Sequence, residues 1–313
     1  MSVEQSGAEI WRRDFVSMGC PCSIQIEVQA RERAEAAFDA AIAELDRLER
    51  KYSHYRDDSL LAQWCAAAGS GEALEVDAES ADLLDLASLL HEQSGGAFDI
   101  SAGALARLWA GPRETLPNPA EIAQAMATGG WQHLIWQRPW LRLQQAGMRL
   151  DLGSLVKEYA ADRAAAICRE QGLLHGIVEL GGDLSVIGPH ANGAPWRAGV
   201  RHPRLPAALA AIELLEGGLA TSGDYERGLL LDGKRYGHIV DPRTGWPVTG
   251  FASVSVLAPN CLVAGAAATL AMLLGVDAGA AYLRELGLPH LTVSADGRIG
   301  GTVAWVDPDP PRL

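Results

Sequence analysis

Residues 140–152, WLRLQQAGMRLDL, carry two short runs of apolar side chains on either side of the turn-forming sequence QQAG. This pattern predicts two short strands joined by a turn, and therefore antiparallel pairing. A helix is predicted to follow over residues 155–169, with Gly172 near its end. Because helices and hairpin-linked strands do not alternate one by one, the chain is predicted to have an α+β fold instead of a doubly wound parallel sheet.

Hydrophobic periodicity predicts further elements on both sides of this stretch. Residues 22–28, CSIQIEV, alternate as a half-buried strand does. Residues 34–51 and 80–93 have apolar side chains at helical spacing, and Gly95 or Gly96 ends the second helix. Strands are also predicted at 175–188, 197–201, 212–221 and 253–258, a helix at 262–274, and a hairpin around Asp296-Gly297.

Composition places the chain among ordinary globular proteins. Of its 313 residues, 48% are hydrophobic and 21% are charged. The length of the chain predicts about two domains or subdomains. The formal net charge of −13 argues against binding of nucleic acid or an anionic membrane, because both are negatively charged. A phosphate ligand stays possible, because a few local donors can bind one inside an acidic protein.

Targeting and redox signals are weak. The five cysteines are scattered and form no CxxC pair, which argues against a zinc ribbon or a disulfide framework. The first fifteen residues lack the apolar core of a signal peptide, and the apolar run 263–276 is too short to span a bilayer. We therefore expect a cytoplasmic protein with no membrane partner.

The stretch 150–157, LDLGSLVK, marks a strand end followed by a helix start. Backbone N–H groups near Ser154 would be available to an anion there, and the charge of Lys157 is unfavourable for the helix dipole unless an anion is bound. The alternative, which this stretch alone favours, is that Ser154 caps the helix and Lys157 extends into solvent.

Three more stretches carry groups that suit a ligand. The paired glycines of 179–183, ELGGD, indicate either close approach to a ligand or a plain turn. In 221–227, TSGDYER, and 238–245, HIVDPRTG, His238 and Asp241 lie three apart before a turn, and we expect them to face one pocket. In 263–272, Thr269 is the only polar side chain of a small-residue helix, which helix packing alone also explains.

Taken together, these stretches resemble the ApbE family of FAD:protein FMN transferases. The resemblance runs from about residue 18 to 274 through the segments MGCPCSIQI, YSHYRDDS, GGAFDISAGAL, LDLGSLVKEYAAD, ELGGDLSVIG, ATSGDYERG and YGHIVDPRTGWPV. It implies two related T-fold-like αβ subdomains with FAD in a cleft between them. The domain is expected to span residues 18–306, with an N-terminal extension at 1–17 and a C-terminal tail at 307–313.

The resemblance also implies a reaction and a set of site residues. A threonine hydroxyl of a target protein attacks the FMN-side phosphate of FAD and releases AMP, with Mg²⁺ on the pyrophosphate. His238 and Asp241 are implied to orient or deprotonate groups, and Ser154 and Thr269 to provide metal-ligand oxygen. The implied FAD-binding residues are Met18, Tyr55, Asp99, Ser154, Lys157, Gly181, Gly182, Asp183, Thr221, Ser222, Gly223 and His238.

Several positions depart from the family pattern. Gly265 stands where the pattern Ala-Asp-Ala-x-x-Thr has a metal-binding Asp, and glycine offers no side-chain oxygen to Mg²⁺. Cys20 replaces Thr in MGT, Glu158 replaces the Gly after the lysine, and Cys65 and Glu179 replace Asn. Glu158 or Glu179 would supply the missing carboxylate from another direction, or Glu158 lies exposed at the surface.

Three functions are compatible with these residues. The first, which we favour, is an FMN transferase with an altered metal site. The second is a catalytically altered flavin-binding protein that serves as a carrier, sensor or assembly partner. The third is an enzyme with different chemistry that uses the Cys20-Pro-Cys22 pair or the new carboxylates.

Overall fold

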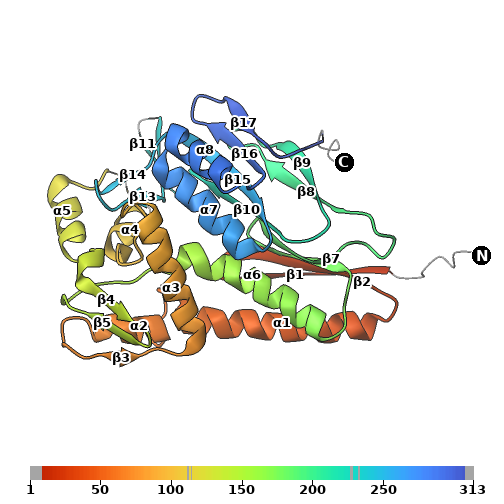
Figure 1. The fold of residues 1–313 in the computed structure, drawn as a ribbon, viewed down its shortest axis with the longest axis horizontal. Helices are drawn as coiled ribbons and strands as arrows, with labels where there is room; N and C mark the ends of the chain where they lie inside the picture. The colour runs from red at the N-terminus through yellow and green to blue at the C-terminus, as the bar shows by residue number, and fades with distance from the viewer. Residues whose placement is uncertain (1–8, 111–112, 114, 226–227, 232, 307–313) are drawn as a thin grey trace, which may run out of the picture.

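The main body of the protein is an eight-stranded antiparallel sheet. The computed structural model describes residues 9–110, 113, 115–225, 228–231 and 233–306. In Figure 1, helices lie in front of part of this sheet. The strand order is β1 (Glu9–Ser17), β2 (Cys20–Val28), β6 (Gly176–Leu180), β7 (Asp183–Gly188), β10 (Gly218–Gly223), β15 (Phe251–Ala258), β16 (His290–Ser294) and β17 (Ile299–Gly301).

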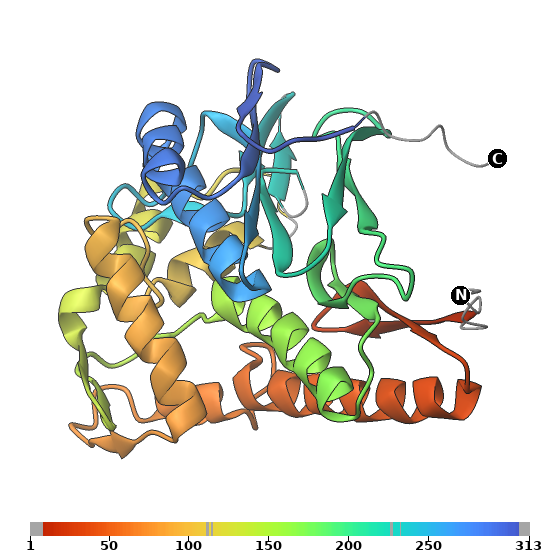
Figure 2. The ribbon, with the colours of Figure 1, turned by 45° about the vertical axis from the view of Figure 1, so that its right-hand side comes forward.

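Helices cover one face of this sheet, as Figure 2 shows. They are α1 (Arg31–Tyr52), α6 (Gly153–Glu170), α7 (Cys261–Leu274) and α8 (Val276–Glu285). The apolar stripe of α1, including Phe38 and Leu45, joins Ile24 and Ile26 of β2 in one buried core. Burial of these stripes holds the helices on the sheet.

A hairpin covers part of the opposite face. It consists of β8 (Trp196–Arg201) and β9 (Ala208–Leu214). Trp196 and Ile212 of the hairpin pack against Ile177 and Leu219 of the main sheet in a second core. Side chains alternate along β6, so Ile177 and Glu179 lie on the hairpin side and Val178 lies on the helix side.

A smaller lobe lies beside the helices (Figure 1). Its sheet has the order β3 (Leu74–Glu75), β5 (Trp140–Leu143), β4 (Leu134–Gln137). Its helices are α2 (Leu60–Ala66), α3 (Ala78–Gln93), α4 (Gly103–Ala110), α5 (Pro119–Ala127) and the 3₁₀ turn η1 (Trp131–His133).

Two small hairpins join this lobe to the main body. They are β11 (Gly228–Leu231) with β12 (Lys234–Gly237), and β13 (Val240–Asp241) with β14 (Trp246–Pro247). The indole N–H of Trp109 on α4 donates a hydrogen bond of 3.0 Å to the Gly245 carbonyl. Leu229 packs in the same small core as Trp109.

The structure confirms the predicted α+β class, while the pairing predicted for residues 140–152 is wrong. β5 pairs with β4, on its N-terminal side, and with β3, so both of its edges are occupied. Residues 148–150 do not pair with β5. Met148 and Leu150 are instead buried in the hydrophobic core. The predicted helix 155–169 begins two residues earlier, at Gly153.

The expected chain divisions have different standing. Residues 9–17 of the expected extension form β1, at the edge of the main sheet. Residues 1–8 and the expected tail 307–313 lie outside the described residues. The eight-stranded sheet is continuous and does not by itself divide the chain into two units. The division into two related T-fold-like subdomains therefore stays a prediction. In the part of the chain that the structure describes, every helix is too short or too polar to cross a membrane.

Candidate active site

An ion pair between the half-buried Lys157 and the buried Asp183 forms the centre of the candidate site. The Lys157 ammonium lies 2.5 Å from Asp183 Oδ2 and 3.9 Å from Glu158 Oε1. Burial acts to lower the pKa of Lys157, but the Asp183 and Glu158 carboxylates outweigh it and raise that pKa above its ordinary value. Lys157 therefore keeps its charge and does not extend freely into solvent.

Asp183 is placed by the turn that precedes it. Leu180 and Asp183 are paired in register, so Gly181 and Gly182 form a two-residue hairpin loop with φ of +58° and +91°. Positive φ at both positions suits glycine. The paired glycines are thus a turn, and this turn directs the Asp183 carboxylate toward α6. Its Oδ1 atom accepts a hydrogen bond of 2.9 Å from the Thr221 N–H.

The hydroxyl groups predicted for the site come together from β10 and α7. The Ser222 and Thr269 hydroxyls lie 2.9 Å apart and share a hydrogen bond. The Thr221 hydroxyl shares one of 2.8 Å with Ser255 on β15. Gly223 ends β10. Thr269 is therefore part of a polar contact with the sheet as well as of the helix packing.

Glu158 is buried, so the expectation that it lies at the surface is wrong. It packs against Gly265 of α7: a Cβ atom placed on Gly265 would lie 2.5 Å from Glu158 Cγ and 3.1 Å from Glu158 Oε1. Its Oε2 atom is buried and has no hydrogen-bond partner. Burial raises the pKa of Glu158, Lys157 lowers it, and Asp183 raises it again, with a net rise.

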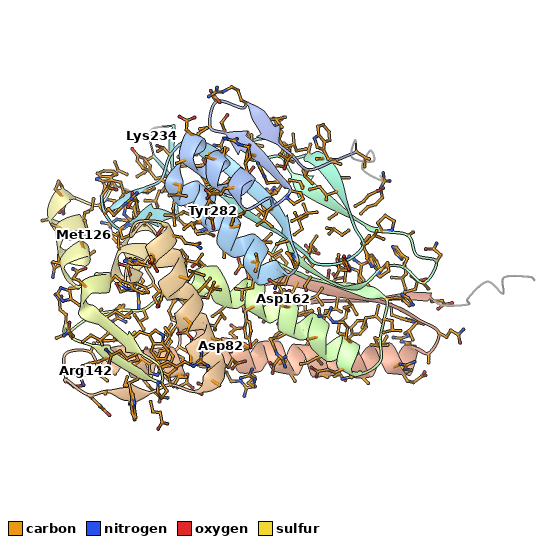
Figure 3. All side chains as sticks on the ribbon, viewed as in Figure 1. Asp82, Met126, Arg142, Asp162, Lys234 and Tyr282 are labelled. Atoms are coloured by element: carbon orange, nitrogen blue, oxygen red, sulfur yellow. The ribbon has the colours of Figure 1, made fainter. Side chains whose placement is uncertain are left out.

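Asp162, which the sequence reasoning missed, fixes α6 against α7. Its two carboxylate oxygens accept hydrogen bonds of 2.9 Å from the backbone N–H groups of Cys261 and Leu262, at the start of α7. Asp162 also accepts a bond of 2.7 Å from the Ser185 hydroxyl. Figure 3 shows Asp162 between the two helices. The signal in the sequence is the spacing of four between Glu158 and Asp162, which places both on one helix face.

Glu179 lies on the other side of the sheet. Its carboxylate accepts a hydrogen bond of 3.0 Å from the Ser23 hydroxyl on β2. It shares a face with Ile177, on the side of the β8–β9 hairpin. Glu179 therefore does not meet Glu158 or Lys157, and the two alternatives for the missing carboxylate are separated by the sheet.

The two thiols of Cys20 and Cys22 lie at the start of β2. Their sulfur atoms are 3.8 Å apart, and neither cysteine forms a disulfide bond. The hydrogen bond with the Cys20 thiol raises the pKa of Cys22, and burial and electrostatic repulsion from Cys20 raise it further. A Cβ atom on Gly181 would lie 2.9 Å from the Cys20 sulfur. The thiol pair is thus next to the turn that places Asp183.

His238 and Asp241 were expected to face one pocket. His238 is half-buried and follows β12 directly. The Asp241 carboxylate pairs with the Arg243 guanidinium, 2.8 Å away, and accepts the Arg243 backbone N–H at 2.9 Å. The shared pocket of His238 and Asp241 stays a prediction. Of the segment 221–227, residues 226 and 227 lie outside the described residues.

Three predicted residues lie in other settings. Tyr55 is 74% exposed, and the centroid of its ring lies 4.0 Å from the centroid of the His54 ring. Met18 has a φ of 52° and donates its backbone N–H to Glu49 at 2.8 Å. Asp99 accepts bonds from the Ser101 and Trp131 backbone N–H groups and so shapes a turn of the smaller lobe. Their predicted contact with flavin is untested.

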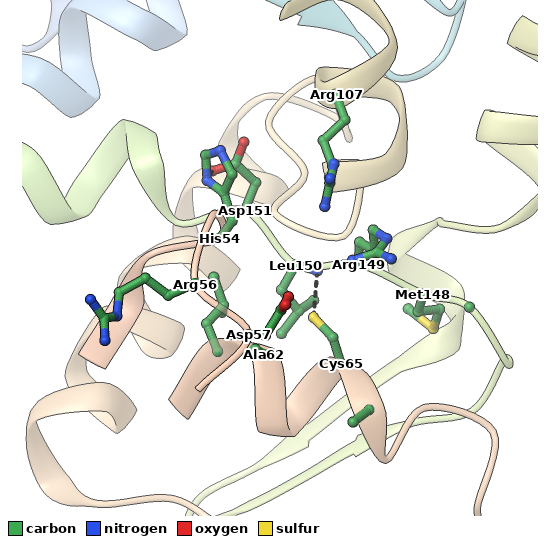
Figure 4. Close-up of a pocket in the computed structure, with 14 residues that line it drawn as sticks. His54, Arg56, Asp57, Ala62, Cys65, Arg107, Met148, Arg149, Leu150 and Asp151 are labelled. Atoms are coloured by element: carbon green, nitrogen blue, oxygen red, sulfur yellow. Dashed lines mark hydrogen bonds and ion pairs between the residues drawn. The ribbon is translucent and has the colours of Figure 1, made fainter. Parts of the chain in front are cut away.

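The start of α6 borders a cavity of the smaller lobe. The N-cap residue of this helix is Leu152, so Ser154 is not its cap. Asp151 Oδ1 accepts the Gly153 N–H at 2.8 Å. Figure 4 shows His54 beside Asp151, with Arg107 and Cys65 on different sides of the cavity. Its volume is about 280 Å³. The Cys65 sulfur accepts the Leu150 N–H at 3.2 Å.

The residues present fit a hard divalent cation. Among the described residues, no three His, Cys, Asp or Glu side chains converge as a ligand set. Mg²⁺ does not need such a set, because proteins commonly hold it with one or two carboxylates together with substrate phosphates. The buried, unpartnered Glu158 Oε2 provides one carboxylate oxygen, and Thr269, one helical turn from Gly265, provides a hydroxyl.

The fold and the site together indicate an α+β protein suited to a charged ligand. Its antiparallel sheet carries an ion-paired carboxylate, and a second buried carboxylate and clustered hydroxyls lie beside it. The chain belongs to the ApbE family, whose model matches residues 18–292. This confirms the resemblance predicted from the sequence.

Relatives of known structure or name agree with this assignment. The FAD:protein FMN transferase of Klebsiella pneumoniae (strain 342) is 34% identical over 306 residues, covering 94% of this chain and 87% of the relative. The ApbE protein of Thermotoga maritima is 31% identical with a TM-score of 0.84, covering 94% of this chain and 97% of that structure. Flavin transferase ApbE of Vibrio cholerae is 26% identical with a TM-score of 0.82, over 94% and 97% of the two chains.

Proposed function

We propose that this chain transfers FMN from FAD to a threonine hydroxyl of a target protein and releases AMP. The observation that carries the proposal is the Lys157–Asp183 pair, held beside Glu158 and the Ser222–Thr269 hydroxyls. The names of the Klebsiella and Vibrio relatives support the same reaction. FAD is proposed to lie along the segments 151–157, 179–183, 221–227 and 238–245.

The proposed reaction breaks one bond to phosphorus and forms another. The threonine Oγ bonds to the FMN-side phosphorus, and the bond from that phosphorus to the bridging oxygen breaks. AMP leaves with the bridging oxygen, and the threonine proton passes to a base. Such transfers depend mainly on positioning and charge neutralisation. The Lys157 ammonium provides a fixed positive charge for a phosphate oxygen, because Asp183 holds it in place.

A divalent cation, when bound, would neutralise charge on the pyrophosphate. Glu158 and Thr269 are the residues that would hold it, with Ser154 of α6 a further predicted oxygen donor. His238 is proposed to accept the threonine proton, since histidine is the side chain that most often serves as a general base. Asp241 is proposed to position the segment after His238, because its carboxylate holds the turn at Arg243.

A specific observation also favours a second candidate. Gly265 has no carboxylate, which is compatible with a flavin-binding protein that does not transfer FMN. The two candidates differ in AMP release. A transferase converts bound FAD to AMP and protein-linked FMN, whereas a carrier or sensor binds FAD and leaves it intact.

The test combines FAD binding with product analysis. Flavin fluorescence is followed during FAD titration, and AMP is measured by chromatography after incubation with Mg²⁺ and the acceptor protein of the Klebsiella relative. We expect a change in flavin fluorescence, AMP release and an acceptor that stays fluorescent on a denaturing gel. Binding without AMP release would support the second candidate. No fluorescence change at high micromolar FAD would exclude both.

A further inference from the structure

The Glu158 carboxylate is an unusual feature of this core. The residue is 6% exposed, and its Oε2 atom has no hydrogen-bond partner. Burying an ionisable group without a partner is unfavourable unless a proton or a counter-charge compensates it. The nearest ammonium, on Lys157, lies 3.9 Å from the other oxygen, Oε1, and only 2.5 Å from Asp183. Lys157 therefore compensates Asp183 first.

The charges of this cluster leave room for one more cation. When Glu158 is ionised, a state that a bound cation would favour, Asp183 and Glu158 contribute two negative charges and Lys157 contributes one positive charge. Two buried oxygens of the cluster have no hydrogen-bond partner, Asp183 Oδ2 and Glu158 Oε2. Asp183 Oδ2 is the atom that Lys157 compensates, whereas the Lys157 contact with Glu158 is to Oε1 and leaves Oε2 without a counter-charge. An oxygen of this kind is a suitable ligand for a hard divalent cation.

Gly265 leaves the space that the Glu158 side chain fills. Glu158 Cγ, Cδ and Oε1 lie 2.5, 2.9 and 3.1 Å from the point where a Cβ of residue 265 would stand. A side chain at 265 and the present conformer of Glu158 are therefore mutually exclusive. Thr269 lies four residues further along α7, on the face of Gly265. A carboxylate from α6 thus occupies the space that an aspartate on α7 would need.

The distance between the two helices is held independently of any ligand. Asp162, one turn after Glu158 on α6, accepts both N–H groups at the start of α7. This contact keeps Glu158 against Gly265. The other candidate carboxylate, Glu179, is on the far side of the sheet.

We propose that Glu158 is the carboxylate that this chain presents to a divalent cation, entering the site from α6 beside Gly265. The proposal rests on the proposed function, because the FAD pyrophosphate would share the cation. Relative to the family pattern noted in the sequence, the acidic residue and the glycine have exchanged helices. The cation class is the hard, oxygen-preferring one, Mg²⁺ or Mn²⁺.

The experiment measures cation binding directly. Mn²⁺ is titrated into chelator-treated protein with and without FAD, and free Mn²⁺ is read by electron paramagnetic resonance. Four proteins are compared: the wild type, E158Q, the double variant E158G/G265D and the control E179Q. Glu158→Gln keeps the shape of the side chain and removes its charge. The double variant moves the carboxylate back to α7, and E179Q removes a carboxylate on the opposite face of the sheet.

We expect Mn²⁺ binding in the wild type and in E179Q, a loss of at least about tenfold in affinity in E158Q, and recovery in E158G/G265D. Equal affinities of E158Q and the wild type would overturn the proposal, as would a wild type that binds no Mn²⁺ in either condition. If E158Q does not fold, the double variant decides, since its binding requires the space beside residue 265 to be the cation site.

Failure of the proposed function gives a different result. FAD cleavage by a wild type that binds no Mn²⁺ with or without FAD would preserve the transferase and overturn the cation site at Glu158. Mn²⁺ binding that depends on Glu158 without any FAD binding would preserve the cation site and exclude the transferase.

Discussion

The Glu158 side chain occupies the space beside the Cα atom of Gly265, with its Cγ atom 2.5 Å from the position of a Cβ atom at that residue. Two residues on neighbouring helices, α6 and α7, are therefore complementary in size. Because Asp162 holds the start of α7, the helices cannot separate freely to admit a second side chain. A change at either position is expected to depend on the residue at the other.

Stability measurements on Gly265→Asp test this dependence. In chelator, G265D should be destabilised by roughly 1–3 kcal/mol, because its side chain meets Glu158 in a packed core. In E158G/G265D the space is free, so the free energy of unfolding should recover much of this loss. Urea denaturation of the wild type, the single variants E158G and G265D, and the double variant E158G/G265D gives the coupling energy. Additive losses would show that the two side chains do not compete for the same space.

The Lys157–Asp183 pair makes a second prediction. Lys157→Met leaves the buried Asp183 carboxylate without its counter-charge and should cost about 3 kcal/mol of stability. K157M/D183N removes both charges and should recover part of this stability. FAD affinity should stay weak in both variants if Lys157 also meets a phosphate. Chemical denaturation and flavin fluorescence measure the two effects separately. A double variant that recovers both would mean that Lys157 serves only to neutralise Asp183.

The α+β class could be predicted because it depends on local patterns. Alternation in residues 22–28 and helical spacing in 34–51 each depend on side chains a few positions apart, and both elements form at nearly those bounds. The partner of β5 could not be predicted in this way. The turn-forming sequence QQAG indicated a hairpin on the C-terminal side of β5, but β5 pairs with β4, and only two residues separate the end of β4 from the start of β5. The other edge of β5 pairs with β3, which is distant in the chain and cannot be found from a local pattern.

The candidate site was predictable to a similar extent. Lys157, Asp183 and Thr269 were identified from motifs, and the structure places them around α6 and its neighbours. The burial of Glu158 was not predictable, because it depends on a glycine more than one hundred positions away on α7. Single-sequence patterns describe one helix face, and they do not specify what packs against it.

A network at the α1–α3 contact makes the stability depend on acid pH. Glu79 accepts hydrogen bonds from Arg47, Lys51 and the Tyr159 hydroxyl. Burial alone would raise the pKa of Glu79, but these partners lower it to about 2, from an ordinary value of 4.5. Since the folded-state pKa is the lower one, the stabilisation is present above pH 4.5 and is lost as the pH falls toward 2.

Glu79→Gln should therefore cost on the order of 1–2 kcal/mol at pH 7, with solvent screening reducing the effect of the shift. The difference between E79Q and the wild type should shrink as the pH is lowered through this window. Urea denaturation at a series of pH values measures it. Glu72→Gln, at an exposed position of the same lobe, is the matched control and should show little difference at any pH. A constant difference for E79Q would contradict the predicted linkage.

His238 provides the last prediction, and it separates a catalytic role from a structural one. His238 is half-buried between β12 and β13, at the beginning of the segment that turns at Asp241. If it accepts the threonine proton, H238A should slow FMN transfer by roughly 10²–10⁴-fold while FAD affinity and the melting temperature change little. If His238 only satisfies a buried partner, H238A should cost about 1–3 kcal/mol of stability and leave transfer by the folded fraction intact.

Asp241→Asn is the control for the turn. It keeps the shape of the side chain that accepts the Arg243 N–H and weakens the ion pair. D241N should change transfer less than H238A, because Asp241 is proposed to act only by holding the segment. Single-turnover transfer assays combined with thermal denaturation distinguish these outcomes. A large loss of stability in H238A with unaltered transfer would assign His238 to the fold and leave the proton acceptor to another group.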